Sequence, residues 1–291
     1  MEVTPSPSSF HKMLDAARSA GLGVGLVPTM GALHAGHISL IERAREECEI
    51  VAVSVFVNPL QFGPSEDFDA YPRDIEGDAR KAAEVGADCL FAPDAAEMFP
   101  HGPIATKVRV DGLASILEGA ARPAHFEGVC TLVAKLLSLA GKCRAYFGEK
   151  DYQQLVIVRR LVADLSIDAG IVNCPIVREL DGLALSSRNA RLSPAERKIA
   201  PILHGALRAG VDALDQGRGF EAAERAMAAH VALEPLFEPD YAVVRDAESL
   251  GDPGAPDAAA LRLLVAARLG AVRLIDNLGW TPPEARSRSL S

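Results

Sequence analysis

The sequence predicts an α/β protein with a doubly wound parallel sheet, followed by a smaller domain of the α+β class. Short runs of branched apolar residues alternate with amphipathic segments over residues 1–177, which is the pattern of successive βαβ units. These runs are apolar throughout, as is typical of parallel strands buried on both faces. From residue 178 the alternation stops. We therefore expect a Rossmann-like domain over residues 1–177 and a C-terminal α+β lid domain over residues 178–291.

The N-terminal domain is predicted to contain five strands joined by helices, after a loose tail at residues 1–9. The predicted strands are Leu22–Val27, Ile50–Val57, Asp88–Ala92, Arg144–Phe147 and Ile171–Val177. The predicted helices are Phe10–Ala20, Gly36–Arg45, Asp74–Gly86, Val129–Ala140 and Leu155–Leu165, whereas residues 93–124 are expected to be irregular. Because βαβ crossovers are right-handed, ligands should bind at the carboxyl ends of the strands.

The C-terminal domain is predicted from a different pattern, in which helices precede strands. The helices are Glu196–Gln216 and Glu221–Leu233, and the strands are Asp240–Arg245, Leu261–Ala267 and Val272–Asp276. The polar tail from Thr281 is expected to be disordered.

The composition restricts the classes of function. The chain has 291 residues, of which 49% are hydrophobic and 24% charged, as in ordinary soluble globular proteins. Its net charge of −9 argues against a general nucleic-acid binder, so an anionic substrate would need a local basic pocket. No apolar run approaches the roughly 20 residues of a membrane span, and the first residues lack the pattern of a signal peptide. We expect a cytoplasmic protein that binds neither nucleic acid nor membranes.

The cysteines are interpreted as structural. They are scattered and show no CxxC pairing, which favours free thiols in a reducing compartment over disulfides or zinc. The five are Cys48, Cys89, Cys130, Cys143 and Cys174.

Two histidines, His34 and His37, fall where the first predicted strand gives way to a helix. The first N–H groups of a helix have no internal partner, and the helix dipole makes that end an anion site. Residues three apart share a helix face, so both imidazoles can reach one bound phosphate. Gly31 and Gly36 would let a ligand approach the backbone. The alternatives are a surface coincidence or a zinc site, although no third ligand lies at a useful spacing.

A second strand-to-helix turn, Gly148–Gln154, also suits phosphate. Gly148 permits close approach, Lys150 supplies a positive charge, and Asp151 is a candidate N-cap. A third polar segment, Ser186–Arg188, combines two hydroxyls with a guanidinium, which suits the β- and γ-phosphates of a nucleotide. Each of these segments has a plainer interpretation as a charged turn or a helix cap.

Other polar residues follow the predicted strands. Gln61 stands in the turn after the second strand, where ligand contacts are common, and a solvated turn is the alternative. Asp78 belongs to an acidic segment that is most simply a solvated helix start. Arg122 and His125 close the irregular segment as pocket or surface residues.

Several of these segments match known motifs. HAGH, residues 34–37, resembles the HxGH signature of the nucleotidyltransferase superfamily, and PTMGALHAGH is more similar to the pantothenate synthetase (pantoate–β-alanine ligase) family. Later segments resemble motifs of that family in the same order: NPLQFG at 58–63, RPAHF at 122–126, FGEKDYQQL at 147–155 and SSRN at 186–189. One departure is Leu185, which stands where methionine is typical.

The resemblance implies an activity. Pantoate would react with ATP to give pantoyl adenylate and pyrophosphate, and β-alanine would then displace AMP to give pantothenate. It also implies Mg²⁺ as a companion of ATP, with Asp78 as a candidate metal contact although we assign no metal ligand, and a homodimer. Two rival functions remain: a nucleotidyltransferase that uses CTP and a phosphorylated alcohol, and a nucleotide-binding dimer without catalysis.

The resemblance also implies residue roles. His34, His37, Lys150 and Arg188 are the expected catalytic residues, with His37 as the proton donor. Gln61 and Gln154 are expected to hold pantoate, Gln61 beside β-alanine, with Arg122 and His125 near the substrate pocket. The expected ATP contacts are Met30, Gly31, Ala32, Leu33, His34, Ala35, Gly36, His37, Gly148, Glu149, Lys150, Asp151, Val177, Leu185, Ser186, Ser187 and Arg188.

Overall fold

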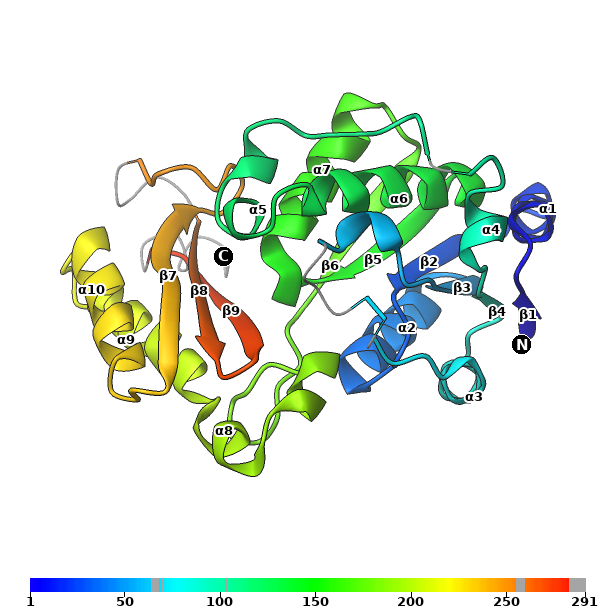
Figure 1. The fold of residues 1–291 in the computed structure, drawn as a ribbon. Coiled ribbons are helices and arrows are strands. Elements are labelled where there is room, and N and C mark those ends of the chain that lie inside the picture. The colour runs from blue at the N-terminus through cyan, green and yellow to red at the C-terminus, as the bar shows by residue number, and fades with distance from the viewer. Residues whose placement is uncertain (64–67, 70, 103, 255–259, 283–291) are drawn as a thin grey trace. The chain divides into compact units, whose positions relative to one another are not determined.

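The apolar runs of the N-terminal half form strands, and the chain divides into two units (Figure 1). The computed structural model describes residues 1–63, 68–69, 71–102, 104–254 and 260–282. The first unit holds Met1–Glu149 and Gln153–Pro175, and the second holds Lys150–Tyr152 and Ile176–Ser291. The tail that we expected to be disordered, beyond its first two residues, lies outside the described part of the chain.

The first unit is built on a sheet whose described strands all run parallel in the order β1-β4-β3-β2-β5-β6. The strands are β1 Glu2–Thr4, β2 Val24–Thr29, β3 Ile50–Val55, β4 Cys89–Phe91, β5 Cys143–Gly148 and β6 Ala169–Cys174. The chain adds β3 and β4 on one side of β2, and β5 and β6 on the other. The predicted doubly wound sheet is confirmed, and its switch point lies between the carboxyl ends of β2 and β5.

The N-terminal tail was predicted wrongly. Glu2–Thr4 pairs with β4 in parallel, and Thr4 is buried. The next helix, α1 (Pro7–Ser19), starts earlier than expected, because the Ser6 side chain caps it and Pro7 occupies its first position. A three-residue edge strand whose one large apolar residue, Val3, is half-exposed leaves no periodic signal in the sequence.

Helices cover both faces of this sheet (Figure 1). α2 packs with α3 on one face, and α1 packs with α6 on the other. The longer helices besides α1 are α2 Ala35–Glu47, α3 Ile75–Glu84, α6 His125–Ala140 and α7 Tyr152–Asp164. Under α2, a core cluster buries Ile41, Val53 and Leu90.

α6 begins at His125, four residues before the predicted start at Val129. The residue before it, Ala124, adopts a left-handed conformation (φ 65°) that turns the chain into the helix. Gly128 lies against the short 3₁₀ turn Pro59–Gln61, and a Cβ there would stand 2.2 Å from the Leu60 carbonyl oxygen. The region expected to be irregular also contains two short helices, α4 (Ala95–Met98) and α5 (Glu118–Ala121).

The second unit has an antiparallel sheet, with strands β7 Phe237–Asp246, β8 Leu261–Leu269 and β9 Val272–Trp280 in that order. Helices α9 (Ile202–Asp215) and α10 (Phe220–Val231) pack on each other; α9 contacts β8 and β9, and α10 contacts β7. Their common core includes Leu207, Met227 and Leu263. The predicted C-terminal α+β architecture is confirmed.

One helix prediction in this unit was wrong. The segment expected to be a single helix, 196–216, is two helices, α8 (Pro194–Ile199) and α9. The break falls at Pro201, which has no N–H to continue the hydrogen-bond ladder.

All five cysteines are free and buried, which confirms their interpretation as core thiols. Within the described residues, none of the helices has the length and apolar character to cross a membrane.

Candidate functional site

The loop between β2 and α2 has an unusual backbone. Gly31 and Ala32 both adopt positive φ angles, 84° and 53°. Gly31 has a second constraint, because a Cβ at this position would lie 2.9 Å from Val55 Cγ1 and 3.0 Å from Asp78 Oδ2. This tight turn brings the chain from the end of β2 to the first residue of α2.

His34 and His37 cap the N-terminus of α2: His34 is the N-cap residue, and His37 is the third residue of the helix. His34 Nδ1 accepts a hydrogen bond from Gly36 N at 3.1 Å, and His37 Nδ1 accepts one from His34 N at 3.4 Å. Because each Nδ1 accepts from a backbone N–H, each neutral ring carries its proton on Nε2. The ring centroids are 4.1 Å apart. The structure thus brings the two histidines together as neighbouring Nε2 donors at a helix N-terminus.

Two side chains of α3 bind the backbone of the loop between β2 and α2. Asp78 is 1% exposed, and its carboxylate accepts hydrogen bonds from Ala32 N (2.8 Å) and Leu33 N (2.7 Å). Lys81 Nζ donates to the Leu33 carbonyl at 2.8 Å. The prediction of a solvated acidic helix start is therefore wrong for Asp78, whereas Asp74 does cap α3 through Gly77 N. Sequence reasoning missed both loop contacts, because they connect residues more than 40 positions apart.

Gln61 lies in the turn after β3 and is held in a fixed orientation. Its Nε2 donates to Met30 Sδ at 3.1 Å, and its Oε1 accepts from Asn58 Nδ2 at 3.1 Å. Asn58 is fully buried and also donates to the Gly128 carbonyl at 3.0 Å. The structure therefore joins two predicted site residues, Met30 and Gln61.

His125 and Arg122 approach the same turn from the start of α6. Arg122 Nη1 lies 3.1 Å from His125 Nε2, and His125 Nδ1 lies 2.8 Å from the Gln61 carbonyl oxygen. Since a guanidinium can only donate, Nε2 accepts and the ring proton sits on Nδ1, which donates to Gln61. His125 is 9% exposed, so the surface alternative is wrong for this residue.

The second predicted phosphate turn is divided between the two units. Gly148 ends β5, and Glu149 accepts a hydrogen bond from Asn173 Nδ2 of β6 at 2.6 Å. Lys150 and Asp151 belong to the second unit, where their side chains form an ion pair of 3.7 Å.

The C-terminal sheet holds the backbone of this turn. Asn277 Nδ2 of β9 donates to the Lys150 carbonyl at 3.0 Å, and Arg262 Nε donates to Asn277 Oδ1 at 2.7 Å. The Arg262 guanidinium lies 3.9 Å from the ring centroid of Tyr152, whose hydroxyl donates to the Ala247 carbonyl. Nothing in the local motif signals these partners, which lie up to 127 positions away.

Two adjacent glutamines follow in α7. Gln153 is 3% exposed and makes three hydrogen bonds, with Leu113 O, Ile116 O and Glu118 N. Gln154, the predicted pantoate contact, is partly exposed.

The remaining predicted residues gather in one loop of the second unit. Leu185 N donates to the Val177 carbonyl at 3.0 Å. Ser186 Oγ accepts from Arg188 N at 3.2 Å and so caps the short 3₁₀ turn Ser187–Arg191. Asn189 Nδ2 donates to Ala184 O at 3.0 Å and closes the loop.

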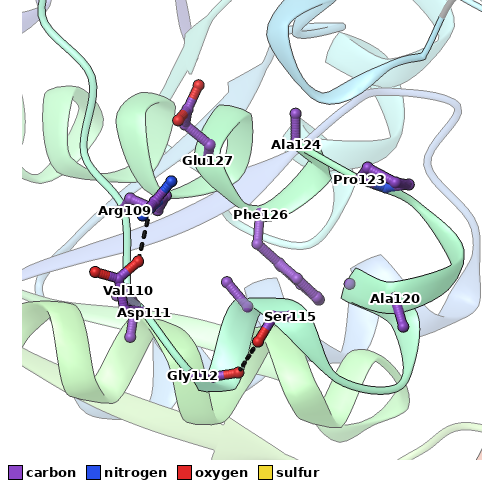
Figure 2. Close-up of a pocket in the computed structure, with 12 residues that line it drawn as sticks. Arg109, Val110, Asp111, Gly112, Ser115, Ala120, Pro123, Ala124, Phe126 and Glu127 are labelled. Carbon is purple, nitrogen blue, oxygen red and sulfur yellow. Dashed lines mark hydrogen bonds and ion pairs between the residues drawn. The ribbon is translucent and has the colours of Figure 1, made fainter.

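A cavity of about 450 Å³ lies beside α6 and is distinct from these groups (Figure 2). Phe126 points into it, while the ion pair of Arg109 with Asp111 lies at one side. None of the described residues that line it was predicted to bind ATP or pantoate.

The parallel sheet and the HxGH turn at its switch point define an α/β protein that resembles the nucleotidyltransferases. Comparison with known families is more specific, because the family described as pantoate-beta-alanine ligase matches residues 2–279. The chain belongs to the pantoate-beta-alanine ligase family. This membership confirms the activity predicted from the sequence, the ligation of pantoate to β-alanine.

Individual relatives agree over nearly the whole chain. Pantothenate synthetase of Thermus thermophilus is 53% identical over 261 residues, which cover 89% of this chain and 94% of the relative. That of Moorella thermoacetica is 47% identical over 279 residues, covering 96% and 98%.

Solved structures agree as well. Pantothenate synthetase from Thermus thermophilus superimposes with a TM-score of 0.89 at 48% identity, covering 97% of this chain and 100% of that one. A pantoate-beta-alanine ligase from Francisella tularensis, complexed with beta-gamma ATP and beta-alanine, gives a TM-score of 0.78 at 34% identity, covering 96% and 97%.

Proposed function

We propose that this chain makes pantothenate in two steps. The pantoate carboxylate attacks the α-phosphate of ATP, which gives pantoyl adenylate and pyrophosphate, and the β-alanine amine then attacks the activated carbonyl and releases AMP. A carboxylate is a poor acyl donor until its oxygen becomes part of a good leaving group, and adenylation provides that group. The observation that carries this proposal is the pair of Nε2 donors at the N-terminus of α2.

In the proposed reaction, His34 and His37 stabilise the negative charge that develops on the phosphates. Two neighbouring donors and the first N–H groups of a helix are suited to this task, and they need little rearrangement during the reaction. We propose His37 as the proton donor. Met30 through Gly36 would contribute the neighbouring surface for the nucleotide.

Gln61 and Gln154 are the proposed pantoate contacts, with Gln61 also beside β-alanine. Asn58 supports this role for Gln61, because it fixes the amide orientation by donating to Oε1. Arg122 and His125 then act from the main-chain side of Gln61, through its carbonyl oxygen.

Cationic side chains are proposed to bind the phosphates that leave as pyrophosphate. We propose that Lys150 and Arg188 neutralise phosphate charge, with Ser186 and Ser187 as hydrogen-bond partners. Met30 and Val177 would line the adenine and ribose side, and Gly148, Glu149, Asp151 and Leu185 would complete the nucleotide contacts. The matches to the FGEKDYQQL and SSRN motifs support these roles.

Mg²⁺ is proposed as a companion of ATP. Magnesium is commonly held by substrate phosphates with only one or two carboxylates. Asp78 fits poorly as a ligand, because it is buried and both of its oxygens already accept backbone N–H bonds. Across the described residues no group of three or more His, Cys, Asp or Glu is arranged to hold a metal.

We also propose a homodimer in the cytoplasm, with the domain boundary at residues 177 and 178. The family resemblance supports the dimer, and the five free, buried thiols are compatible with a reducing compartment.

The test is exchange of labelled pyrophosphate into ATP, with pantoate present and β-alanine absent. An adenylate mechanism predicts exchange that depends on pantoate, because the first step must be reversible on its own. Exchange that requires β-alanine would contradict the intermediate. Exchange with CTP and a phosphorylated alcohol, or ATP binding with no turnover at all, would favour one of the two rival functions.

A further inference from the structure

We infer that Asp78 and Lys81 are positioning residues, which set the orientation of the His34–His37 pair through the backbone of residues 31–34. Neither side chain is assigned to touch a substrate. The inference rests on the proposed role of the two histidines in binding ATP.

The backbone that they hold needs outside support. Gly31 and Ala32 are consecutive residues with positive φ, and the left-handed region is disfavoured for alanine. A turn of this shape persists when surrounding contacts over-determine it. α3 provides those contacts, because Asp78 and Lys81 are three residues apart and share one helix face.

Together the two side chains fix three successive peptide planes. Asp78 accepts from the N–H of Ala32 and from the N–H of Leu33, which belong to the planes 31–32 and 32–33. Lys81 donates to the Leu33 carbonyl, which belongs to the plane 33–34.

The third peptide plane, 33–34, links the contacts of Asp78 and Lys81 to the two histidines. Its carbonyl is held by Lys81, and its N–H is that of His34, which donates to His37 Nδ1. Rotation of this plane would therefore break the bond that fixes the tautomer and orientation of His37. α3 thus acts on the proposed proton donor through one peptide group.

The burial of Asp78 strengthens this reasoning. A carboxylate that is 1% exposed must be satisfied by hydrogen bonds, and two backbone N–H groups supply them. Asparagine at this position offers only one acceptor oxygen, and its NH₂ group would face a backbone donor. Asp78→Asn should therefore loosen the turn with almost no change in volume.

The experiment is the pantoate-dependent pyrophosphate exchange assay on Asp78→Asn and Lys81→Met, with Glu76→Gln as the matched control. Glu76 is an exposed acid of the same helix, so the control repeats the charge change without the loop contacts. We expect kcat/KM for ATP to fall about 10- to 100-fold in Asp78→Asn and about 3- to 10-fold in Lys81→Met. Lys81→Arg keeps a donor and should therefore lose less kcat/KM than Lys81→Met. In Lys81→Met, KM for pantoate and the melting temperature should change much less than kcat/KM for ATP.

The outcomes separate the two hypotheses. If the wild-type protein shows no pantoate-dependent exchange, the proposed function fails. If the wild type is active and both variants equal the Glu76→Gln control, the positioning role is overturned. Recovery of Asp78→Asn to wild-type rates by excess Mg²⁺ would also overturn it, because Asp78 would then be acting as a metal ligand. Should Asp78→Asn fail to fold, the exposed position of Lys81 still leaves its two variants as a decisive test.

Discussion

The loop after β2 and the loop after β5 make an instructive pair. Their strands are parallel neighbours, and both loops lead from a strand into a helix at the switch point of the sheet. The first loop is held entirely within its own unit, by Asp78 and Lys81 of α3. The second is divided, because Glu149 is bound by β6 whereas the carbonyl of Lys150 is bound by Asn277 of the C-terminal sheet.

The two loops therefore differ in which unit of the chain positions their proposed ligand-binding residues. Lys150 takes its position from Asn277 of the second unit, whereas the histidines take theirs from α3 of the first unit. The FGEKDYQQL motif is continuous in sequence, but its residues are held by different units of the structure. Variants that remove the supports of each loop can test this division.

The largest effect is expected for the histidine loop itself. His37→Ala removes the proposed proton donor and one partner of the capping pair, and adenylate formation should fall about 100-fold or more. Lys150→Ala should cause a loss of the same order from the other loop. Single-turnover formation of adenylate measures both, with circular dichroism as the check on folding. Wild-type rates in either variant would remove that residue from the mechanism.

The two adjacent glutamines at the start of α7, which follows the second loop, should respond differently to substitution. Gln154→Ala is expected to raise KM for pantoate about 10-fold while the melting temperature stays near that of the wild type, since its side chain is partly exposed. Gln153→Ala removes three hydrogen bonds from a buried position and should chiefly lower the melting temperature. Steady-state kinetics and thermal unfolding should be measured on both variants. Equal kinetic losses would contradict the assignment of Gln154 to pantoate binding and of Gln153 to stability.

A smaller effect is expected at the support of Lys150. Asn277→Ala deletes the donor to the Lys150 carbonyl, and kcat/KM for ATP should fall about 5- to 10-fold, as for the loss of one hydrogen bond of about 1 kcal/mol. Asn173→Ala is the control, because it removes the hydrogen bond to Glu149 in the first unit instead. A loss in the control as large as in Asn277→Ala would show that the loop depends equally on both units. Melting temperatures are needed for both, since Asn277 is buried.

These two loops also show which features of the site could be predicted from the sequence and which could not. Hydrophobic periodicity located the strands and helices around them, and the spacing of His34 and His37 was enough to predict a shared helix face. The supports were not predictable, because Asp78 and Asn277 bind backbone atoms of residues distant in sequence. A backbone N–H or carbonyl group is the same in every residue type (apart from proline, which lacks the N–H), so no sequence motif records such a contact. Asp78 was misjudged for this reason, since an acid near a helix start is usually solvated.

The smallest expected effect concerns the second unit alone. Burial is the main cause that lowers the pKa of His204 in α9 from its usual 6.5, with Arg178 and Arg208 acting in the same direction and Asp276 opposing them. The folded state therefore favours the neutral ring. Its contribution to stability is complete above pH 6.5 and is lost as the pH falls through the lower pKa of the folded state.

Trp280 allows this effect to be measured in one unit. It is the only tryptophan in the sequence, and it is buried at the end of β9 with its indole N–H donating to Asp215 at 2.8 Å. Between pH 7 and pH 5, the melting temperature followed by its fluorescence should fall roughly 2 to 4 °C further in the wild type than in His204→Gln. Activity at pH 7 should be the same in both, because His204 has no proposed contact with substrate. Parallel pH profiles would mean that the buried imidazole does not titrate with unfolding, and that the stability of the C-terminal unit depends on other groups.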